Sequence, residues 1–373
     1  MPIYFDISAA VHRRAGLGRY AESLARELLP LLGDRLAFFC NQERGIAPLV
    51  WLEDVPARTV SLGYKPWRML VWAGQLAHVG FNRLTPGAEL FHATEHLLLP
   101  LRGIPTVLTV HDLIFRRYPE HHKPLNRWYL NLTLPLFCQR ATRIIAVSEQ
   151  SKRDVVAAYG IPPEKITVIY EAADARFRPQ PPETVAEARS RYHLPGRYLL
   201  FVGTIEPRKN LGRLLQAFER LRAEKLTDAL VIVGKRGWLY DDFIAQWEAS
   251  PARDAVIFPG WVDDADLPAI YAGAQALAFP SIFEGFGLPI LEAMGCGTPV
   301  ACSNTSSLPE VAGDAAVLFD PQDDDALTDA LRRLLSDRDL ADALAARGLA
   351  QAARFSWARA AQETAALYGE LLR

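Results

Sequence analysis

Two glutamates eight positions apart flank the most glycine-rich junction of the chain. Glu284 and Glu292 enclose a run that contains Gly285, Gly287 and Pro289. Glycines let the backbone approach a ligand, and proline suits the first turn of a helix, so a helix is expected to begin near Pro289. Glu292 then lies one turn inside an apolar helix, where a carboxylate is costly without a partner. The two hydroxyls of a ribose are one such partner, and an ion pair within the protein is another.

A pair of adjacent basic residues marks a second junction, within residues 203–210. Arg208 and Lys209 follow an apolar run at 198–202, which has the composition of a strand, and precede an amphipathic pattern at 211–222. Cations at the start of a helix are well placed to neutralise a diphosphate. An ordinary surface pair is the alternative.

Two glycines open the first helical pattern of the chain, at 18–32. Gly16 and Gly18 free backbone amides to approach a phosphate, and a helix N-terminus adds a favourable dipole. Ala21 stands where the dinucleotide fingerprint G-x-G-x-x-G has its third glycine, which disfavours an NAD-dependent oxidoreductase. A tight turn without a ligand is the structural alternative.

A histidine ends another apolar run, at 106–111. Ligands of open α/β sheets bind at the carboxyl ends of the strands, so His111 is placed to bond a sugar hydroxyl or a reacting group. A histidine that only stabilises the fold is the alternative.

The elements that must carry these residues alternate regularly. Short apolar runs, mostly β-branched or aromatic, have the composition of strands buried on both faces, and amphipathic helical patterns separate them. This alternation predicts α/β units with parallel sheets. The predicted strands are residues 3–7, 36–40, 89–92, 106–111, 143–147 and 166–170, then 198–202, 229–233, 255–258, 276–279, 299–302 and 316–319.

A proline-rich segment divides this series into two units of similar size. Residues 178–182 contain three prolines, which predicts an extended linker. The predicted domains are 1–178 and 179–355, followed by a terminal helix at 356–373 with Ser356 as its N-cap.

Composition excludes several classes of protein. Lys and Arg number 41 against 43 Asp and Glu, so no basic excess indicates a nucleic-acid partner. The cysteines form no C-x-x-C pair, which disfavours a disulfide scaffold or zinc site and favours the cytoplasm. The first residues lack the features of a secretory signal, and no run of about 18 apolar residues predicts a transmembrane helix.

Taken in order, these motifs resemble the signature of retaining GT-B glycosyltransferases of glycosyltransferase family 4. The resemblance spans nearly the whole chain and implies two Rossmann-like domains that face a cleft, with the helix around Trp357 crossing back to the first. The matching segments are the E-x7-E pair Glu284 and Glu292 within residues 281–292, residues 206–210, Gly16-x-Gly18-Arg19-Tyr20, His111-Asp112 and Val147-Ser148-Glu149.

The resemblance implies a role for each matched residue of the second domain, which is expected to bind the nucleotide sugar. Glu292 would bind the donor ribose, Arg208 and Lys209 would hold the diphosphate, and Glu284 would contact the transferred sugar. Amide groups near that sugar would come from Phe286, Gly287 and Leu288.

In the first, acceptor-side domain, the resemblance implies that the backbone of Gly16 to Gly18 closes over the phosphates and that His111 contacts the sugar. The implied reaction is retaining, with the leaving phosphate acting as the base on the front face of the sugar. Arg208 and Lys209 suit the charge that develops on that phosphate, and a nearby carboxylate suits the charge on the sugar.

Metal-independent transfer is expected. Asp264-Ala265-Asp266 has the D-x-D form of a metal-binding motif, but it precedes a helical pattern at 267–272 and is interpreted as an N-cap. No cofactor beyond the sugar-nucleotide substrate is expected.

The resemblance to bacterial mannosyltransferases of this family favours GDP-mannose as the donor, with UDP- and dTDP-linked hexoses as alternatives. The acceptor is expected to be a glycan or a lipid-linked glycan. A GT-B nucleotide-sugar epimerase and a non-catalytic sugar-nucleotide-binding protein remain alternative functions.

One segment suggests a membrane. Residues 64–84 combine Trp67, Trp72 and other apolar residues with Lys65, Arg68 and Arg83. Such a helix either packs on the sheet of the first domain or lies weakly and salt-sensitively in a membrane interface, at the inner face of the cytoplasmic membrane.

Overall fold

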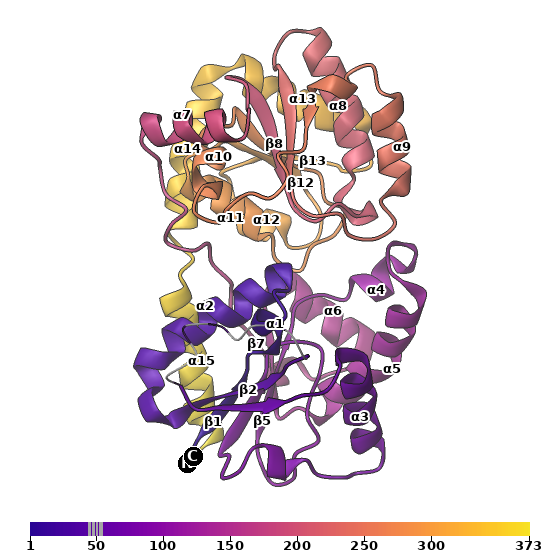
Figure 1. The fold of residues 1–373 in the computed structure, drawn as a ribbon, viewed down its shortest axis with the longest axis vertical. Coiled ribbons are helices and arrows are strands. Elements are labelled where there is room, and N and C mark those ends of the chain that lie inside the picture. Colours follow the sequence, from indigo (N-terminus) through magenta and orange to yellow (C-terminus); the bar gives the residue numbers. More distant parts are fainter. Residues whose placement is uncertain (44–45, 47–48, 50, 52–54) are drawn as a thin grey trace. The chain divides into compact units, whose positions relative to one another are not determined.

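The chain forms two compact units in the computed structural model, which describes residues 1–43, 46, 49, 51 and 55–373 (Figure 1). The first unit contains Met1–Glu171 together with Ser356–Arg373, and the second contains Ala172–Phe355. The boundary between the units thus lies ahead of the proline-rich segment, and residues 172–178 belong with the second unit. Pro182 is already the first residue of a helix.

The first unit is built on a parallel sheet of seven strands in the order β3-β2-β1-β4-β5-β6-β7. The two halves of the sheet grow outward from β1, which pairs with β2 on one side and β4 on the other. This is a doubly wound order. The strands are β1 (Ile3–Asp6), β2 (Leu36–Asn41), β3 (Ala57–Val60), β4 (Leu90–Ala93), β5 (Thr106–Val110), β6 (Arg143–Ala146) and β7 (Ile166–Val168).

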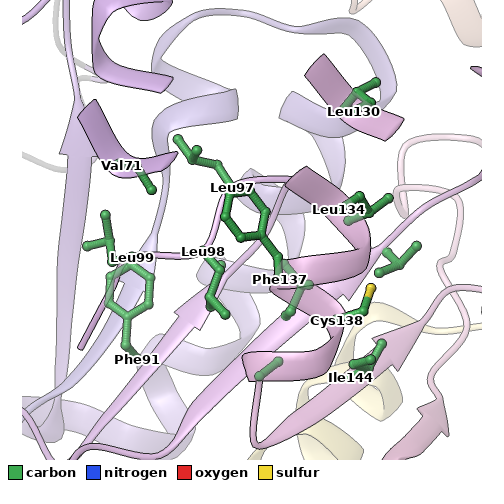
Figure 2. Close-up of a cluster of buried hydrophobic side chains, with 14 of the residues drawn as sticks. Val71, Phe91, Leu97, Leu98, Leu99, Leu130, Leu134, Phe137, Cys138 and Ile144 are labelled. Atoms are coloured by element: carbon green, nitrogen blue, oxygen red, sulfur yellow. The ribbon is translucent and has the colours of Figure 1, made fainter. Parts of the chain in front are cut away.

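Six helices of the described residues connect these strands. They are α1 (Ser8–Val11), α2 (Ala15–Leu32), α3 (Tyr64–Leu76), α4 (Ile114–Arg117), α5 (Pro124–Arg140) and α6 (Glu149–Tyr159). Val71 of α3 and Leu130, Leu134 and Phe137 of α5 point into one apolar cluster with Phe91 of β4 (Figure 2). The inner faces of α3 and α5 are therefore both covered by the same core.

The terminal helix α15 (Trp357–Leu371) belongs to the first unit, as the sequence predicted. The Ser356 side chain accepts a hydrogen bond from the Arg359 amide at 3.1 Å, which confirms it as the N-cap. The helix packs against α2, and the buried hydroxyl of Tyr368 lies 2.6 Å from Nδ1 of His92.

The second unit is built on a parallel sheet of six strands in the order β10-β9-β8-β11-β12-β13. It repeats the doubly wound pattern, with β8 at the point where the strand order reverses. The strands are β8 (Tyr198–Val202), β9 (Ala229–Val233), β10 (Val256–Ile257), β11 (Ala276–Phe279), β12 (Val300–Ser303) and β13 (Val317–Phe319). The helices are α7 (Pro182–Arg191), α8 (Leu211–Ala223), α9 (Asp241–Ala249), α10 (Leu267–Ala272), α11 (Leu288–Gly295), α12 (Leu308–Ala312), α13 (Asp324–Ser336) and α14 (Arg338–Ala352).

Two local expectations are corrected by the structure. Strand β3 was not expected, because Ala57, Arg58 and Thr59 are exposed at the edge of the sheet and lack the apolar signal of a buried strand. Asp266 occupies the N-cap position of α10 but makes no capping bond. Its carboxylate instead accepts hydrogen bonds from Arg191 at 2.6 Å and from the Tyr192 hydroxyl at 2.7 Å.

The helices were expected to include no transmembrane segment. Within the described part of the chain, no helix has both the length and the apolar character needed to span a bilayer.

Candidate functional site

Three loops meet at the carboxyl edge of the second sheet, because β8, β11 and β12 are neighbouring strands. The amide of Ile282, after β11, donates to the Arg208 carbonyl, after β8, at 2.8 Å. On its other side the same loop is held by Ser306 and Ser307, which follow β12: the Glu284 amide donates to the Ser306 hydroxyl at 2.9 Å, and the Ser307 hydroxyl donates to the Glu284 carbonyl at 3.0 Å. The loop that carries Glu284 is therefore fixed from both sides.

A glycine allows two loops to approach closely at the carboxyl edge of the second sheet. Gly234, after β9, has φ +154°, and a Cβ built on it would lie 1.9 Å from the carbonyl oxygen of Gly203, after β8. Only glycine fits there, so the loops that follow β8 and β9 run against each other. This contact supports the loop from which Arg208 and Lys209 extend.

Arg208, Lys209 and Glu284 form one charged cluster. The Arg208 guanidinium donates to Glu284 Oε2 at 2.5 Å, and the Lys209 ammonium contacts Glu284 Oε1. On its other side the Arg208 Nε lies 2.5 Å from a carboxylate oxygen of Glu206. Two cations and two carboxylates thus alternate in a largely buried group, and the structure brings together three of the residues that the sequence predicted for the diphosphate and the sugar.

The charge state of this cluster follows from its geometry. Burial alone would raise the pKa of Glu284, but the positive charges of Arg208 and Lys209 outweigh burial and hold the pKa at about 2. Burial raises the pKa of Glu206, and burial together with Arg208 lowers the pKa of Lys209. Glu284 is therefore ionised near neutral pH.

The helix expected after this loop is present as α11, and Gly287 is its N-cap with φ +120°. A Cβ at Gly287 would lie 2.9 Å from Leu308, so both the backbone conformation and the space favour glycine. Phe286 and Leu288 flank it, which places the expected amide segment directly beside Glu284.

Glu292 lies one turn into α11 and is buried, as predicted. Its Oε2 accepts a hydrogen bond from the Tyr271 hydroxyl at 2.7 Å. Sequence reasoning did not find this partner, because Tyr271 belongs to α10 and no sequence signal links the two positions. The carboxylate has further lone pairs for ribose hydroxyls, so the ribose assignment stays a prediction.

Gly16 and Gly18 do not form the expected loop before a helix, because α2 already begins at Ala15. The Gly18 amide donates to the Arg14 carbonyl, and a Cβ at Gly18 would lie 3.0 Å from the Ala9 carbonyl oxygen. Gly18 thus permits close packing of α2 on α1, and its amide is committed to the helix. Gly16 is exposed in the first turn, where amides have no acceptor within the helix.

His111 follows β5 and is buried, with both ring nitrogens engaged. Nε2 lies 2.9 Å from the Thr94 carbonyl oxygen, which only accepts, so Nε2 carries a proton. Nδ1 lies 3.2 Å from the Glu171 carboxylate, which follows β7. Burial disfavours a charged ring, but the bond to Glu171 outweighs burial and raises the pKa of His111. Glu171 was missed because it lies 60 residues from its partner.

A second polar cluster lies at the carboxyl edge of the first sheet. Asp6 accepts a bond from the Ser8 amide at 2.8 Å, while Arg14 contacts Glu95 and the Tyr64 hydroxyl. Burial and the nearby charge of Glu95 raise the pKa of Asp6 to about 7. These residues lie at the same edge of the first sheet as His111.

Metal-ligating side chains do not gather in the described residues: they contain no group of three or more His, Cys, Asp or Glu arranged to hold an ion. Asp264 lies 3.8 Å from Arg176, and Asp266 is engaged by Arg191 and Tyr192. The D-x-D segment is thus held by cationic and hydroxyl partners from the protein.

The two doubly wound units have the GT-B fold, as the similar solved structures show. Sucrose-phosphate synthase from Thermosynechococcus elongatus has a TM-score of 0.79 and 21% identity, and the match covers 100% of this chain and 99% of that one. Anabaena HepE in complex with UDP-glucose has a TM-score of 0.78 and 20% identity, with coverage of 99% and 100%.

Family models match both units. "Glycosyltransferase Family 4" matches residues 14–177, and "Glycosyl transferases group 1" matches residues 187–351. The chain belongs to this glycosyltransferase family, as the motifs indicated.

Among the curated relatives are several mannosyltransferases. "O-antigen chain mannosyltransferase B" of Escherichia coli is 38% identical over 75% of this chain and 74% of its own length. "MMP alpha-(1->4)-mannosyltransferase" of Mycolicibacterium hassiacum is 32% identical over 95% and 94%. "Serotype-specific mannosyltransferase WbdA" of Escherichia coli is 33% identical over 70% of this chain, but the match spans only 33% of that protein.

Proposed function

We propose that this glycosyltransferase transfers mannose from GDP-mannose to a glycan or a lipid-linked glycan, with retention of configuration and without a metal ion. The observation that carries the proposal is the charged cluster, in which one ionised carboxylate, Glu284, contacts both Arg208 and Lys209. The printed names of the relatives support mannose as the transferred sugar.

The cluster suits the charges of glycosyl transfer. A diphosphate that reaches Arg208 and Lys209 competes with Glu284 for both cations, and each contact with the phosphate is a charge-assisted hydrogen bond. As the glycosyl bond breaks, the two cations stabilise the leaving diphosphate. Glu284, displaced from the cations toward the sugar, stabilises the positive charge that develops there.

His111 is unsuited to act as a general base. Nε2 already carries a proton that it donates to Thr94, and the pair with Glu171 occupies Nδ1. The proton of the acceptor hydroxyl therefore has to go elsewhere, and the leaving phosphate is the group that we propose as the base. In the folded chain the contacts of His111 with Thr94 and Glu171 fix the orientation of its ring.

The location and the acceptor are part of the proposal. All four cysteines are buried free thiols, which fits a reducing cytoplasm. A lipid-linked acceptor would require contact with a membrane, for which residues 64–84 were the candidate in the sequence.

A panel of sugar nucleotides tests this function. GDP-mannose, UDP-glucose and dTDP-glucose are each incubated with a mannose-terminated oligosaccharide, free and lipid-linked, and the released nucleoside diphosphate is measured. We expect GDP release from GDP-mannose that depends on the acceptor. Isomerised sugar nucleotide without release of the diphosphate would identify an epimerase, and binding without turnover would identify a non-catalytic protein.

A further inference from the structure

Two helices of the first unit lie side by side and share one outer face. The Arg68 guanidinium of α3 donates to the Asn126 side chain of α5 at 2.8 Å, and the rings of Trp72 and Trp128 meet edge to face with their centroids 5.8 Å apart. Their inner faces fill a common core, as Figure 2 shows for Val71 and Leu134. What remains outside is a surface made by both helices.

Apolar side chains occupy this outer surface in two adjoining stripes. Positions 69, 72 and 76 follow one another at helical spacing on α3, and positions 125, 128 and 132 do so on α5. The Trp72–Trp128 contact joins the stripes. We call the six side chains the α3–α5 surface: Met69, Trp72, Leu76, Leu125, Trp128 and Leu132.

The exposure of this surface is unusual for the chain. Among the described residues, thirteen large apolar side chains are exposed, and five of them belong to the α3–α5 surface. Leu125 is 85% exposed and Trp128 is 53% exposed. Contiguous apolar patches of this kind mark interaction sites, whereas single exposed apolar residues are ordinary.

The two segments that carry the surface have acidic residues only beyond their ends. Residues 55–88 and 121–148 contain no Asp or Glu, although the whole chain has 43 acidic and 41 basic residues. The same two segments contain eight basic residues, namely Arg58, Lys65, Arg68, Arg83, Lys123, Arg127, Arg140 and Arg143. An apolar surface on segments whose own charged residues are all basic is complementary to an apolar layer beneath anionic headgroups.

We propose that the α3–α5 surface docks onto an anionic lipid bilayer. Leu125 and Trp128 insert at the interface, and Lys65, Arg68, Lys123 and Arg127 meet the headgroups. A second copy of the chain is a poorer partner, because a twofold interface on this face would oppose cations to cations. The inference deepens the proposed function, because it brings the acceptor-side unit to the place where a lipid-linked glycan is found.

Vesicle co-sedimentation of the full chain tests the proposal. Vesicles of phosphatidylcholine alone are compared with vesicles that also contain phosphatidylglycerol, at low and at high salt. We expect binding to the anionic vesicles at low salt, weakened by high salt. The Leu125→Ser/Trp128→Ser variant should lower the partition coefficient by about tenfold or more, since it removes two apolar anchors.

A matched control is available in the second unit. Leu239 and Trp261 are 51% and 85% exposed, and Leu239→Ser/Trp261→Ser should bind vesicles like the wild type. Equal binding by both double variants, or no preference for anionic lipid, would overturn the proposal. Self-association that disappears in Leu125→Ser/Trp128→Ser, without lipid binding by the wild type, would assign the surface to a second copy instead. Vesicle binding needs no turnover, so this outcome is independent of the sugar-nucleotide panel.

Discussion

Glu284 is expected to affect both the stability of the protein and the rate of transfer. It links Arg208 and Lys209 in a buried cluster, and the same two cations are the groups that we assign to the diphosphate. A carboxylate in this position holds both cations in place in the absence of substrate. Its replacement should therefore change both the pH dependence of stability and the rate.

Glu284→Gln should lower the rate of transfer about a hundredfold, since the sugar loses a charge that stabilises it. The variant should also lose less stability than the wild type when the pH is lowered. The folded pKa of about 2 lies below the ordinary 4.5, so the stabilisation is present above pH 4.5 and is lost between pH 4.5 and 2. That shift corresponds to about 3 kcal/mol at most.

Thermal melting from pH 6 down to pH 3 measures the second effect. Between pH 4.5 and 3 the wild type should lose more stability than Glu284→Gln does. Glu248→Gln, on the exposed part of α9, is the matched control and should follow the wild type. Parallel curves for all three proteins would contradict the charge state that we assign to Glu284.

Glu171 should control the protonation of His111. In the wild type the ring donates to Thr94 through Nε2 and pairs with the carboxylate through Nδ1, which raises the pKa of His111. In Glu171→Gln the carboxylate is gone while burial remains, so the pKa should fall below the ordinary value of a histidine. Nitrogen NMR chemical shifts of the labelled ring measure this directly.

We expect the His111 ring of the wild type to keep its second proton to a higher pH than the ring of Glu171→Gln does. His193, exposed in the second unit, provides an internal reference in the same spectra. A ring with the same titration in both proteins would show that Glu171 does not hold its proton.

At the scale of elements, α2 offers a matched pair of glycines. A Cβ at Gly16 meets nothing within 4 Å, whereas a Cβ at Gly18 lies 3.0 Å from a backbone oxygen of α1. Gly16→Ala should stabilise the first unit by about 0.5–1 kcal/mol, because alanine favours the helix. Gly18→Ala should destabilise it by about 1 kcal/mol, because α1 must shift. Urea unfolding measures the free energy of unfolding of the two variants. Equal changes in both would contradict the packing role of Gly18.

Most of the fold could be predicted because the strands are buried on both faces. Runs such as 198–202 and 229–233 have no polar residue and coincide with β8 and β9. Strand β3 was not predicted, because an exposed edge strand lacks this apolar signal. The start of α2 was predicted too late in the sequence, because its N-cap residue, Arg14, makes no side-chain capping bond. Without that signal, Gly16 and Gly18 were interpreted as a loop.

The site could be predicted only in part, for a related reason. Arg208, Lys209 and Glu284 belong to local motifs, and neighbouring strands bring these motifs together. Glu206 stood inside the motif and was given no role, although its place next to Arg208 was a usable signal. Tyr271 contacts Glu292, and Glu171 contacts His111. Each pair joins segments that are distant in the sequence, so it becomes visible only in the folded structure.

At the scale of the whole molecule, we propose that the chain supplies its own positive charge to the leaving group. The net charge is only −2, yet two cations lie within one buried cluster. Because Arg208 and Lys209 can stabilise the diphosphate, EDTA should leave the rate of transfer unchanged. A rate that collapses with EDTA and returns with Mn²⁺ would contradict metal-independent transfer.

The central claim is that the charged cluster of the second unit binds the diphosphate of a sugar nucleotide. Calorimetric titration of GDP-mannose into the wild type and into Arg208→Ala/Lys209→Ala tests it most directly. Arg220→Ala/Lys225→Ala removes one arginine and one lysine from exposed positions of α8 and its C-terminal loop, and it serves as the control. With the folded state of each variant verified by melting, we predict that the Kd rises about a hundredfold or more only in the first variant, since two charge-assisted contacts are lost. An unchanged Kd in a folded Arg208→Ala/Lys209→Ala protein would contradict the account.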